Sequence, residues 1–271
     1  MIRAMFFDLD GTLLSRNGTV SIQNRKALER AREKGILTGI ATGRELSSVQ
    51  ALMEKWQIDG LIDLIVGTGG SEVCDLRTGY IEQDHFLDGE LIREVITHFE
   101  DMDCGFVVPL HGKLYAPKDD RFIRELSAAD ELPYEIVDFD TFLTSPKPKL
   151  MLVTDPEKMD QIVERAGTFR NDRYKAASLI TASILYEYMD PNVTKAGGIA
   201  KILEPFGITL EETAAFGDAD NDEHMLKSVG FGIAMGNGSE KTKAAADLIT
   251  VDSEENGVAQ GIDYVLDIVN Q

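Results

Sequence analysis

The chain has 271 residues, of which 43% are hydrophobic, and a formal net charge of −20 at pH 7. This length suits one large globular domain or a core with an inserted domain. The acidic balance argues against nucleic acid and anionic membranes as partners, because Lys and Arg side chains bind their phosphate groups.

The first part of the chain alternates between predicted strands and helices. A short apolar run ending at Asp8 is typical of a buried strand, and Gly11 indicates a sharp turn after it. The further elements expected are a helix from the N-cap Ser21 to about Lys34, a strand over 36–41, a helix over 47–56 and a strand over 61–66.

The last part of the chain repeats this alternation. It predicts a helix over 196–206, a strand over 213–216, a helix over 223–229, a strand over 231–235, a helix over 239–246, a strand over 248–251 and a helix from Gly257. Alternating strands and helices favour an α/β fold, a doubly wound and mostly parallel sheet with right-handed crossovers.

The middle of the chain has shorter apolar segments and more polar breaks. We expect an α+β cap domain over 84–188, inserted between two parts of one core domain, 1–83 and 189–271. Its expected elements are a helix over 89–99, strands over 104–108 and 113–116, a strand over 150–153 with a helix over 157–166, and a strand pair within 178–188.

Two carboxylates follow the first strand at positions i and i+2. Asp8 is expected at the carboxyl end of that strand and Asp10 on the turn beyond it, where open α/β sheets bind ligands. Acids this close repel each other, so a shared proton, a basic side chain or a metal ion has to hold their charge. The alternative is a turn that is merely rich in Asp and Gly.

Other polar loops are expected at the same edge of the sheet. They carry Thr42-Gly43-Arg44, the run 217–222 with Asp218, Asp220 and Asp222, and Lys195 just before a helix. Asp8 is suited to nucleophilic attack and Asp10 to proton transfer. The acidic run supplies oxygen ligands for Mg²⁺, and Thr42, Gly43 and Lys195 can hold a phosphoryl group.

Each of these loops also has an ordinary interpretation. Alone, Thr42-Gly43 is a turn, Lys195 is a surface lysine, and the acidic run is an acidic turn or a calcium loop. The run lacks the Gly and the terminal Glu at EF-hand spacing. The functional interpretation depends on all the loops occurring in this order after the expected elements.

This combination resembles the haloacid dehalogenase superfamily of aspartate-nucleophile phosphatases. Within it, the sequence is similar to the Cof-type sugar-phosphate phosphatases with a large α+β (C2B-like) cap. The matching segments are Asp8-Leu9-Asp10-Gly11-Thr12, the Thr of Ala41-Thr42-Gly43-Arg44, Lys195, the run 217–222, the run 233–237 and Asn256-Gly257-Val258. The chain departs from the family pattern at Thr68-Gly69, where Asn-Gly is common, and at Lys195-Ala196, where Lys-Gly is common.

The resemblance implies a role for each matching residue. Asp8 is the implied nucleophile and Asp10 the general acid and base. The implied Mg²⁺ ligands are the Asp8 carboxylate, the Asp10 carbonyl, Asp218, and Asp222 directly or through water. The implied phosphate-binding residues are Thr42, Gly43, Lys195 and Asn221, while Arg44 is either a substrate contact or part of a structural salt bridge.

We therefore expect a Mg²⁺-dependent phosphatase that acts on a small phosphorylated metabolite, with a sugar phosphate as the first expectation. The cap is expected to close over the site and to contact the leaving group. The alternatives are a phosphomannomutase-like phosphotransferase and a non-catalytic sensor of a sugar phosphate.

Cysteine content and apolar patterning bear on localisation. Cys74 and Cys104 match neither a disulfide scaffold nor a zinc site. The N-terminal residues lead into a strand rather than a signal peptide, and no apolar stretch approaches the roughly 18 residues of a membrane span. We expect a cytoplasmic protein.

Overall fold

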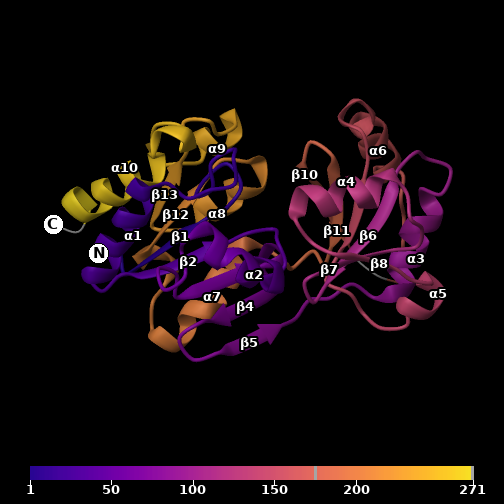
Figure 1. The fold of residues 1–271 in the computed structure, drawn as a ribbon, viewed down its shortest axis with the longest axis horizontal. Coiled ribbons are helices and arrows are strands. Elements are labelled where there is room, and N and C mark those ends of the chain that lie inside the picture. Colours follow the sequence, from indigo (N-terminus) through magenta and orange to yellow (C-terminus); the bar gives the residue numbers. More distant parts are fainter. Residues whose placement is uncertain (174–175, 270–271) are drawn as a thin grey trace. The chain divides into compact units, whose positions relative to one another are not determined.

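The structure, a computed structural model, describes residues 1–173 and 176–269 and forms two compact units (Figure 1). The first unit combines Met1–Gln83 with Thr194–Gln271, and the second comprises Asp84–Val193. The sequence places its second junction at 188/189, whereas the second unit extends to Val193, four residues beyond the strand that ends at Met189.

The first unit is built on an eight-stranded sheet with the order β14-β13-β12-β1-β2-β3-β4-β5. Neighbouring strands from β14 to β3 are parallel, and β3, β4 and β5 are antiparallel. The predicted doubly wound, mostly parallel sheet is confirmed. The strands are β1 Ala4–Phe7, β2 Leu37–Ala41, β3 Leu64–Gly67, β4 Glu72–Asp75, β5 Tyr80–Gln83, β12 Thr213–Gly217, β13 Phe231–Ala234 and β14 Leu248–Ile249.

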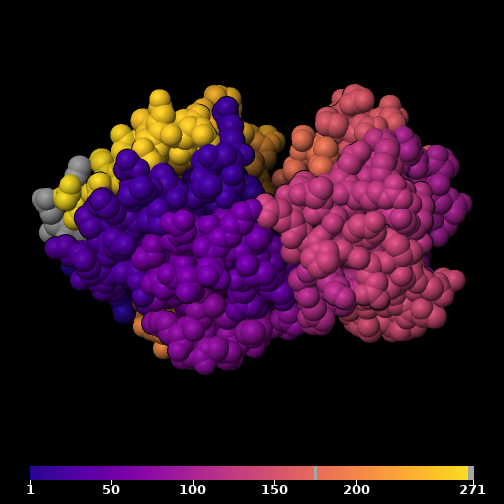
Figure 2. Space-filling model, in the orientation of Figure 1, coloured from indigo at the N-terminus to yellow at the C-terminus, as the bar shows by residue number. Residues whose placement is uncertain are grey.

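Helices cover both faces of this sheet. Because successive strand residues point to opposite faces, Phe7 packs with α1, α2 and α10, whereas Phe6 packs with α7 and α8. Figure 2 shows the C-terminal segment (yellow) beside the N-terminal segment (indigo), in agreement with the packing of α10 on α1. The helices are α1 Ile22–Glu33, α2 Leu46–Trp56, α7 Lys195–Leu203, α8 Glu223–Ser228, α9 Glu240–Ala244 and α10 Gly257–Tyr264.

Short irregular helical turns join these elements. The 3₁₀ turns of both units cover Thr68–Gly70, Pro156–Lys158, Glu204–Phe206, Leu210–Glu212, Asp220–Asp222 and Ser253–Glu255, and a π-helical turn covers Val265–Val269. Two of them, Thr68–Gly70 and Asp220–Asp222, follow strands of the central sheet at their carboxyl ends.

The second unit is an α+β domain with a six-stranded sheet in the order β10-β11-β9-β6-β7-β8. Its strands are β6 Gly105–Leu110, β7 Lys113–Ala116, β8 Tyr134–Ile136, β9 Leu150–Val153, β10 Ala177–Ala182 and β11 Leu185–Met189. Its helices are α3 Gly89–His98, α4 Arg121–Asp130, α5 Phe139–Phe142 and α6 Met159–Ala166. Among the residues that the structure describes, no helix is long and apolar enough to span a membrane.

Several short elements were not predicted. The hairpin of β4 and β5 begins and ends with charged or polar residues, and β5 is mostly exposed, so neither strand has an apolar run. α4 buries only Phe122, Ile123 and Leu126, and β8 and α5 are three and four residues long. β8 and α5 are too short to carry a periodic pattern, whereas the buried residues of α4 have helical spacing that the sequence analysis did not recognise.

Candidate active site

The first strand leads at Asp8 into a tight turn that lets Asp218, which follows β12, approach closely. The Asp8 N–H donates to the Phe216 carbonyl at 2.9 Å, which continues the parallel pairing of β1 with β12. Gly11 has a φ of +85°, and a Cβ atom there would lie 2.4 Å from Asp218 Oδ2. Glycine is therefore required for both the backbone conformation and the close approach of Asp218.

Asp218 follows β12 and is held by the same turn. The Thr12 hydroxyl donates to Asp218 Oδ1 at 2.7 Å. Asn237 Nδ2 donates to the Gly11 carbonyl at 2.8 Å, and its Oδ1 accepts from the Ser253 N–H at 2.9 Å. Thr12 and Asn237 lie in segments that the family resemblance covers. Sequence reasoning gave neither residue a role, because a single hydroxyl or amide side chain has no distinctive spacing.

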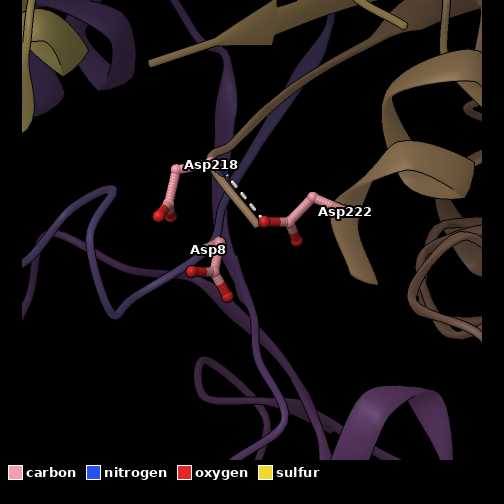
Figure 3. Close-up of side chains that lie close together, drawn as sticks. All are labelled: Asp8, Asp218 and Asp222. Atoms are coloured by element: carbon pink, nitrogen blue, oxygen red, sulfur yellow. Dashed lines mark hydrogen bonds between the residues drawn. The ribbon is translucent and has the colours of Figure 1, made fainter. Parts of the chain in front are cut away.

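Asp222 is fully buried and orders the acidic loop. Its Oδ2 accepts from the Asp218 N–H at 3.0 Å (Figure 3). The same oxygen accepts from the Ala219 N–H at 3.1 Å. Its Oδ1 accepts from Lys195 Nζ at 2.6 Å, and the same ammonium donates to Asp8 Oδ1 at 2.6 Å. Lys195, the first residue of α7, therefore joins two carboxylates that lie far apart in the sequence.

Asp8, Asp218 and Asp222 form a carboxylate cluster with one potential ligand atom from each side chain within 4.8 Å of the others (Figure 3). Asp8 Oδ2 and Asp218 Oδ2 accept no hydrogen bond from any described part of the chain. An all-oxygen carboxylate set fits a hard cation such as Mg²⁺. Both oxygens of Asp222 already accept hydrogen bonds, so Asp8 and Asp218 offer the better free donors.

The electrostatics of the cluster are those of a site with excess negative charge. Burial raises the pKa of Asp8 well above its usual range, and the Lys195 ammonium only partly offsets this. Burial, with the nearby Asp222 carboxylate, raises the pKa of Asp218 to about 6 despite the hydrogen bond from Thr12. Burial would lower the pKa of Lys195, but Asp222 and Asp8 outweigh it and raise that pKa above its usual range. Three acids and one ammonium thus favour binding a further cation.

Asp10 lies apart from this cluster. Its half-exposed carboxylate is bound by Arg44, with Nε donating to Oδ2 at 2.8 Å and a terminal guanidinium nitrogen donating to Oδ1 at 2.9 Å. Of the two interpretations of Arg44 that the sequence left open, the structure contains the salt bridge. Asp10 and Arg44 therefore join the turn after β1 to the loop after β2.

Thr42, Gly43 and Arg44 form a turn at the end of β2, in which Thr42 is buried and Gly43 and Arg44 are partly exposed. The Thr42 hydroxyl accepts from the Arg44 N–H at 3.2 Å, and its own proton has no acceptor among the described residues. The Thr42 and Arg44 carbonyls accept from the N–H groups of Gly69 and Thr68 at 2.9 and 2.8 Å. The hydroxyl is thus available to donate to a bound anion.

Asn221 and Asp220, two further residues of the acidic loop, differ in their hydrogen bonding. The buried Asn221 Oδ1 has no hydrogen-bond partner within the described chain, so Asn221 retains an unused acceptor. Asp220, by contrast, accepts from Ser239 Oγ at 2.6 Å and Lys241 Nζ at 2.8 Å. The sequence suggested Asp220 as a neighbouring metal ligand, but these bonds hold its carboxylate in an exposed ion pair outside the carboxylate cluster.

A family model for haloacid dehalogenase-like hydrolases matches residues 5–262. The phosphatase YwpJ of Bacillus subtilis is 26% identical over 98% of this chain and 100% of its own. The 5-amino-6-(5-phospho-D-ribitylamino)uracil phosphatase YcsE of Bacillus subtilis is 27% identical over 96% of this chain and 94% of its own. A solved haloacid dehalogenase-like hydrolase from Bacteroides thetaiotaomicron superposes with a TM-score of 0.85 at 25% identity, covering 98% of this chain and 100% of the other.

The chain belongs to the haloacid dehalogenase-like hydrolases. The predicted family and the predicted enzyme class, a phosphatase, are both confirmed.

Proposed function

We propose that this phosphatase hydrolyses a small phosphorylated metabolite, with sugar phosphates as the first candidates, through an aspartyl-phosphate at Asp8 and with Mg²⁺ as cofactor. The observation that carries the proposal is Lys195 bridging Asp8 and Asp222 beside Asp218. A phosphate dianion enters such an acidic site only if cations offset its charge, and the site pairs one fixed ammonium with oxygens suited to a divalent ion.

In the first step Asp8 is the nucleophile. Asp8 attacks phosphorus through one carboxylate oxygen, while the other stays bound to the cations of the site, as Oδ1 is bound to Lys195. As this bond forms, the bond from phosphorus to the leaving oxygen breaks, and that oxygen takes the proton of the Asp10 carboxyl group. The products are an aspartyl-phosphate and a free alcohol. The Arg44 pair with Asp10 has to open for this transfer, because both carboxylate oxygens of Asp10 are bound.

In the second step water attacks the same phosphorus atom. Asp10 takes a proton from the water, the bond between phosphorus and the Asp8 oxygen breaks, and inorganic phosphate leaves. The Thr42 hydroxyl, the Gly43 N–H, the Lys195 ammonium and Asn221 Nδ2 donate to the phosphoryl oxygens in both steps. Asp8, Asp218, the Asp10 carbonyl and Asp222 would hold Mg²⁺, which would neutralise charge on the phosphoryl group when bound.

The substrate class is supported by one of the relatives. The YcsE phosphatase is named for a phosphate carried on a D-ribityl chain, a phosphorylated polyol. We propose a phosphorylated sugar or polyol for this chain too, acted on in the cytoplasm. The buried thiols of Cys74 and Cys104, both unpaired in the structure, suit a reducing compartment.

Phosphate release from a panel of sugar phosphates, nucleotides and pyridoxal phosphate tests the proposal. Each compound is assayed with Mg²⁺ and with EDTA, for the native protein, for Asp8→Asn and for Asp263→Asn, an exposed control that pairs with Arg30. We expect release that requires both Mg²⁺ and Asp8 and is fastest for a sugar or polyol phosphate. Transfer to a second hydroxyl without free phosphate would indicate a phosphotransferase, and binding without turnover would indicate a sensor.

A further inference from the structure

A buried carboxylate outside the cluster, Glu72 on β4, has only neutral hydrogen-bond donors among the residues that the structure describes. Its Oε2 accepts from the Thr68 hydroxyl at 2.5 Å and from the Leu46 N–H at 2.9 Å, and its Oε1 accepts from Gln83 Nε2 at 2.7 Å. Leu46 is the first residue of α2, so one donor is a free N–H of a helix N-terminus. Burying a carboxylate without a cationic partner costs free energy, and hydrogen bonds have to offset the loss of its hydration.

The Thr68 backbone adopts a conformation that its residue type disfavours. Its φ is +46°, in the left-handed region, where β-branched residues are rare. This conformation directs two successive N–H groups at the loop after β2. The N–H of Thr68 donates to the Arg44 carbonyl at 2.8 Å, and that of Gly69 donates to the Thr42 carbonyl at 2.9 Å.

These two hydrogen bonds determine where the Gly43 N–H points. The Thr42 carbonyl and the Gly43 N–H belong to one planar peptide unit, and in a trans peptide they point in opposite directions. Fixing the carbonyl through Gly69 therefore directs the Gly43 N–H away from the Thr68–Gly70 turn. The Arg44–Glu45 peptide, two peptide units further on, is fixed in the same way, because the Arg44 carbonyl is bound to Thr68.

The other side of the turn lies against the start of α7. A Cβ atom on Gly70, whose φ is +123°, would lie 2.2 Å from the Thr194 carbonyl. A Cβ atom on Gly198 would lie 3.0 Å from the Gly70 Cα. Thr194 immediately precedes Lys195 and caps α7. One turn is therefore packed between the Thr42–Arg44 loop and the helix end that carries Lys195.

We propose that Glu72 and Thr68 are positioning residues for phosphate binding, because they hold the turn that orients the Gly43 N–H and abuts Lys195. The proposal rests on the proposed function, since it assumes that the loop 42–44 binds phosphate. Glu72 binds the Thr68 side chain and the first N–H of α2. It therefore fixes both the Thr68–Gly70 turn, which follows β3, and the start of α2, which follows the loop after β2. Neither residue needs to touch the substrate.

The test compares Thr68→Val, which keeps the side-chain shape and removes the hydroxyl, with Thr68→Ser, which keeps the hydroxyl. Thr78→Val is the matched control, because the Thr78 hydroxyl donates to the Asp75 carbonyl in the neighbouring hairpin turn. Glu72→Gln removes an acceptor from the same network. The probe is inorganic phosphate, titrated in Mg²⁺ by calorimetry, and the Gly43 amide resonance is followed by NMR.

We expect Thr68→Val and Glu72→Gln to weaken phosphate binding by about tenfold to a hundredfold, the usual effect of losing well-oriented donors to a charged group. The Gly43 amide resonance should shift in both. Thr68→Ser and Thr78→Val should bind within about twofold of the native protein. If Glu72→Gln does not fold, the Val and Ser variants at position 68 decide the question.

Two results would overturn the positioning role. One is lower thermal stability of Thr68→Val with native phosphate affinity and an unshifted Gly43 resonance, which would mean that the network is only structural. The other is equal loss in Thr68→Ser and Thr68→Val, which would mean that the hydroxyl is irrelevant. Native protein that binds phosphate but hydrolyses nothing would refute the proposed hydrolysis while leaving this role intact, and native protein that neither binds nor hydrolyses would refute both.

Discussion

Replacing Lys195 by methionine should destabilise the first unit more than any surface lysine change. The Lys195 side chain is 5% exposed, and its ammonium lies 2.6 Å from oxygens of Asp8 and Asp222, whose side chains are 10% and 0% exposed. Methionine keeps the length and removes the charge, which leaves two buried carboxylates without a counter-charge. Breaking a buried ion pair in this way costs about 3–5 kcal/mol.

For a unit of this size, about 3–5 kcal/mol corresponds to a fall in Tm of roughly 10 °C. Trp56 is the single tryptophan of the chain and is buried in the first unit, so its fluorescence reports the unfolding of that unit alone. The assay is thermal unfolding in EDTA and in Mg²⁺. Lys227→Met is the control, because Lys227 pairs with Glu223 at 2.6 Å on α8 with both side chains exposed, and such pairs contribute little.

Mg²⁺ should restore part of the lost stability in Lys195→Met and should raise its Tm by more than it raises that of the native protein. The reason is that a divalent cation then supplies charge that the ammonium no longer provides, and a ligand bound only by the folded state stabilises it. Equal Tm values for Lys195→Met and Lys227→Met in EDTA would refute the reasoning. So would an identical Mg²⁺ effect on all three proteins.

Three further predictions concern the same turn and loop. In denaturant unfolding, Gly11→Ala should lower stability by about 2–4 kcal/mol, because its Cβ would meet Asp218 Oδ2 at 2.4 Å, and it should also abolish Mg²⁺ binding. Gly18→Ala is the control, because Gly18 has a φ of +70° and no atom within 4 Å of the added Cβ, and it should cost only about 1 kcal/mol. Mg²⁺ affinity measured by calorimetry should fall about tenfold between pH 7.5 and pH 5, because burial raises the pKa of Asp218 to about 6 and a proton that binds below this value competes with the metal; a flat profile would contradict this. Asp218→Asn should abolish phosphate release while Asp220→Asn retains it, since Asp220 is bound to Ser239 and Lys241 instead; equal losses would show that Asp220 acts in the site.

The layout of the core was predictable because its signals are local and strong. The run Met5-Phe6-Phe7 is wholly buried, as a strand covered on both faces requires, and Ser21 accepts from the Asn24 N–H at 3.0 Å as the predicted N-cap. The hairpin of β4 and β5 was missed, since Glu72 is buried by its hydrogen bonds rather than by apolarity and its partner Gln83 is eleven residues away.

The candidate site was predictable to the extent that its residues come from the ends of neighbouring parallel strands. The structure brings Asp8, Asp218, Asp222 and Lys195 together, as this topology implies. It could not be predicted that Arg44 binds Asp10, since the spacing fits substrate binding equally well. The supporting contacts of Thr12 and Asn237 were also beyond sequence reasoning, because each joins segments more than two hundred residues apart.

The central claim is that Asp8 becomes covalently phosphorylated during turnover. The most direct measurement is acid quenching of the enzyme during hydrolysis of its fastest substrate in Mg²⁺, followed by mass spectrometry of the peptide that contains Asp8. We predict a phosphoryl adduct on Asp8 that forms and decays at rates compatible with turnover and that is absent in Asp8→Asn. Phosphate release that persists in Asp8→Asn, with no adduct on the native peptide, would contradict the mechanism.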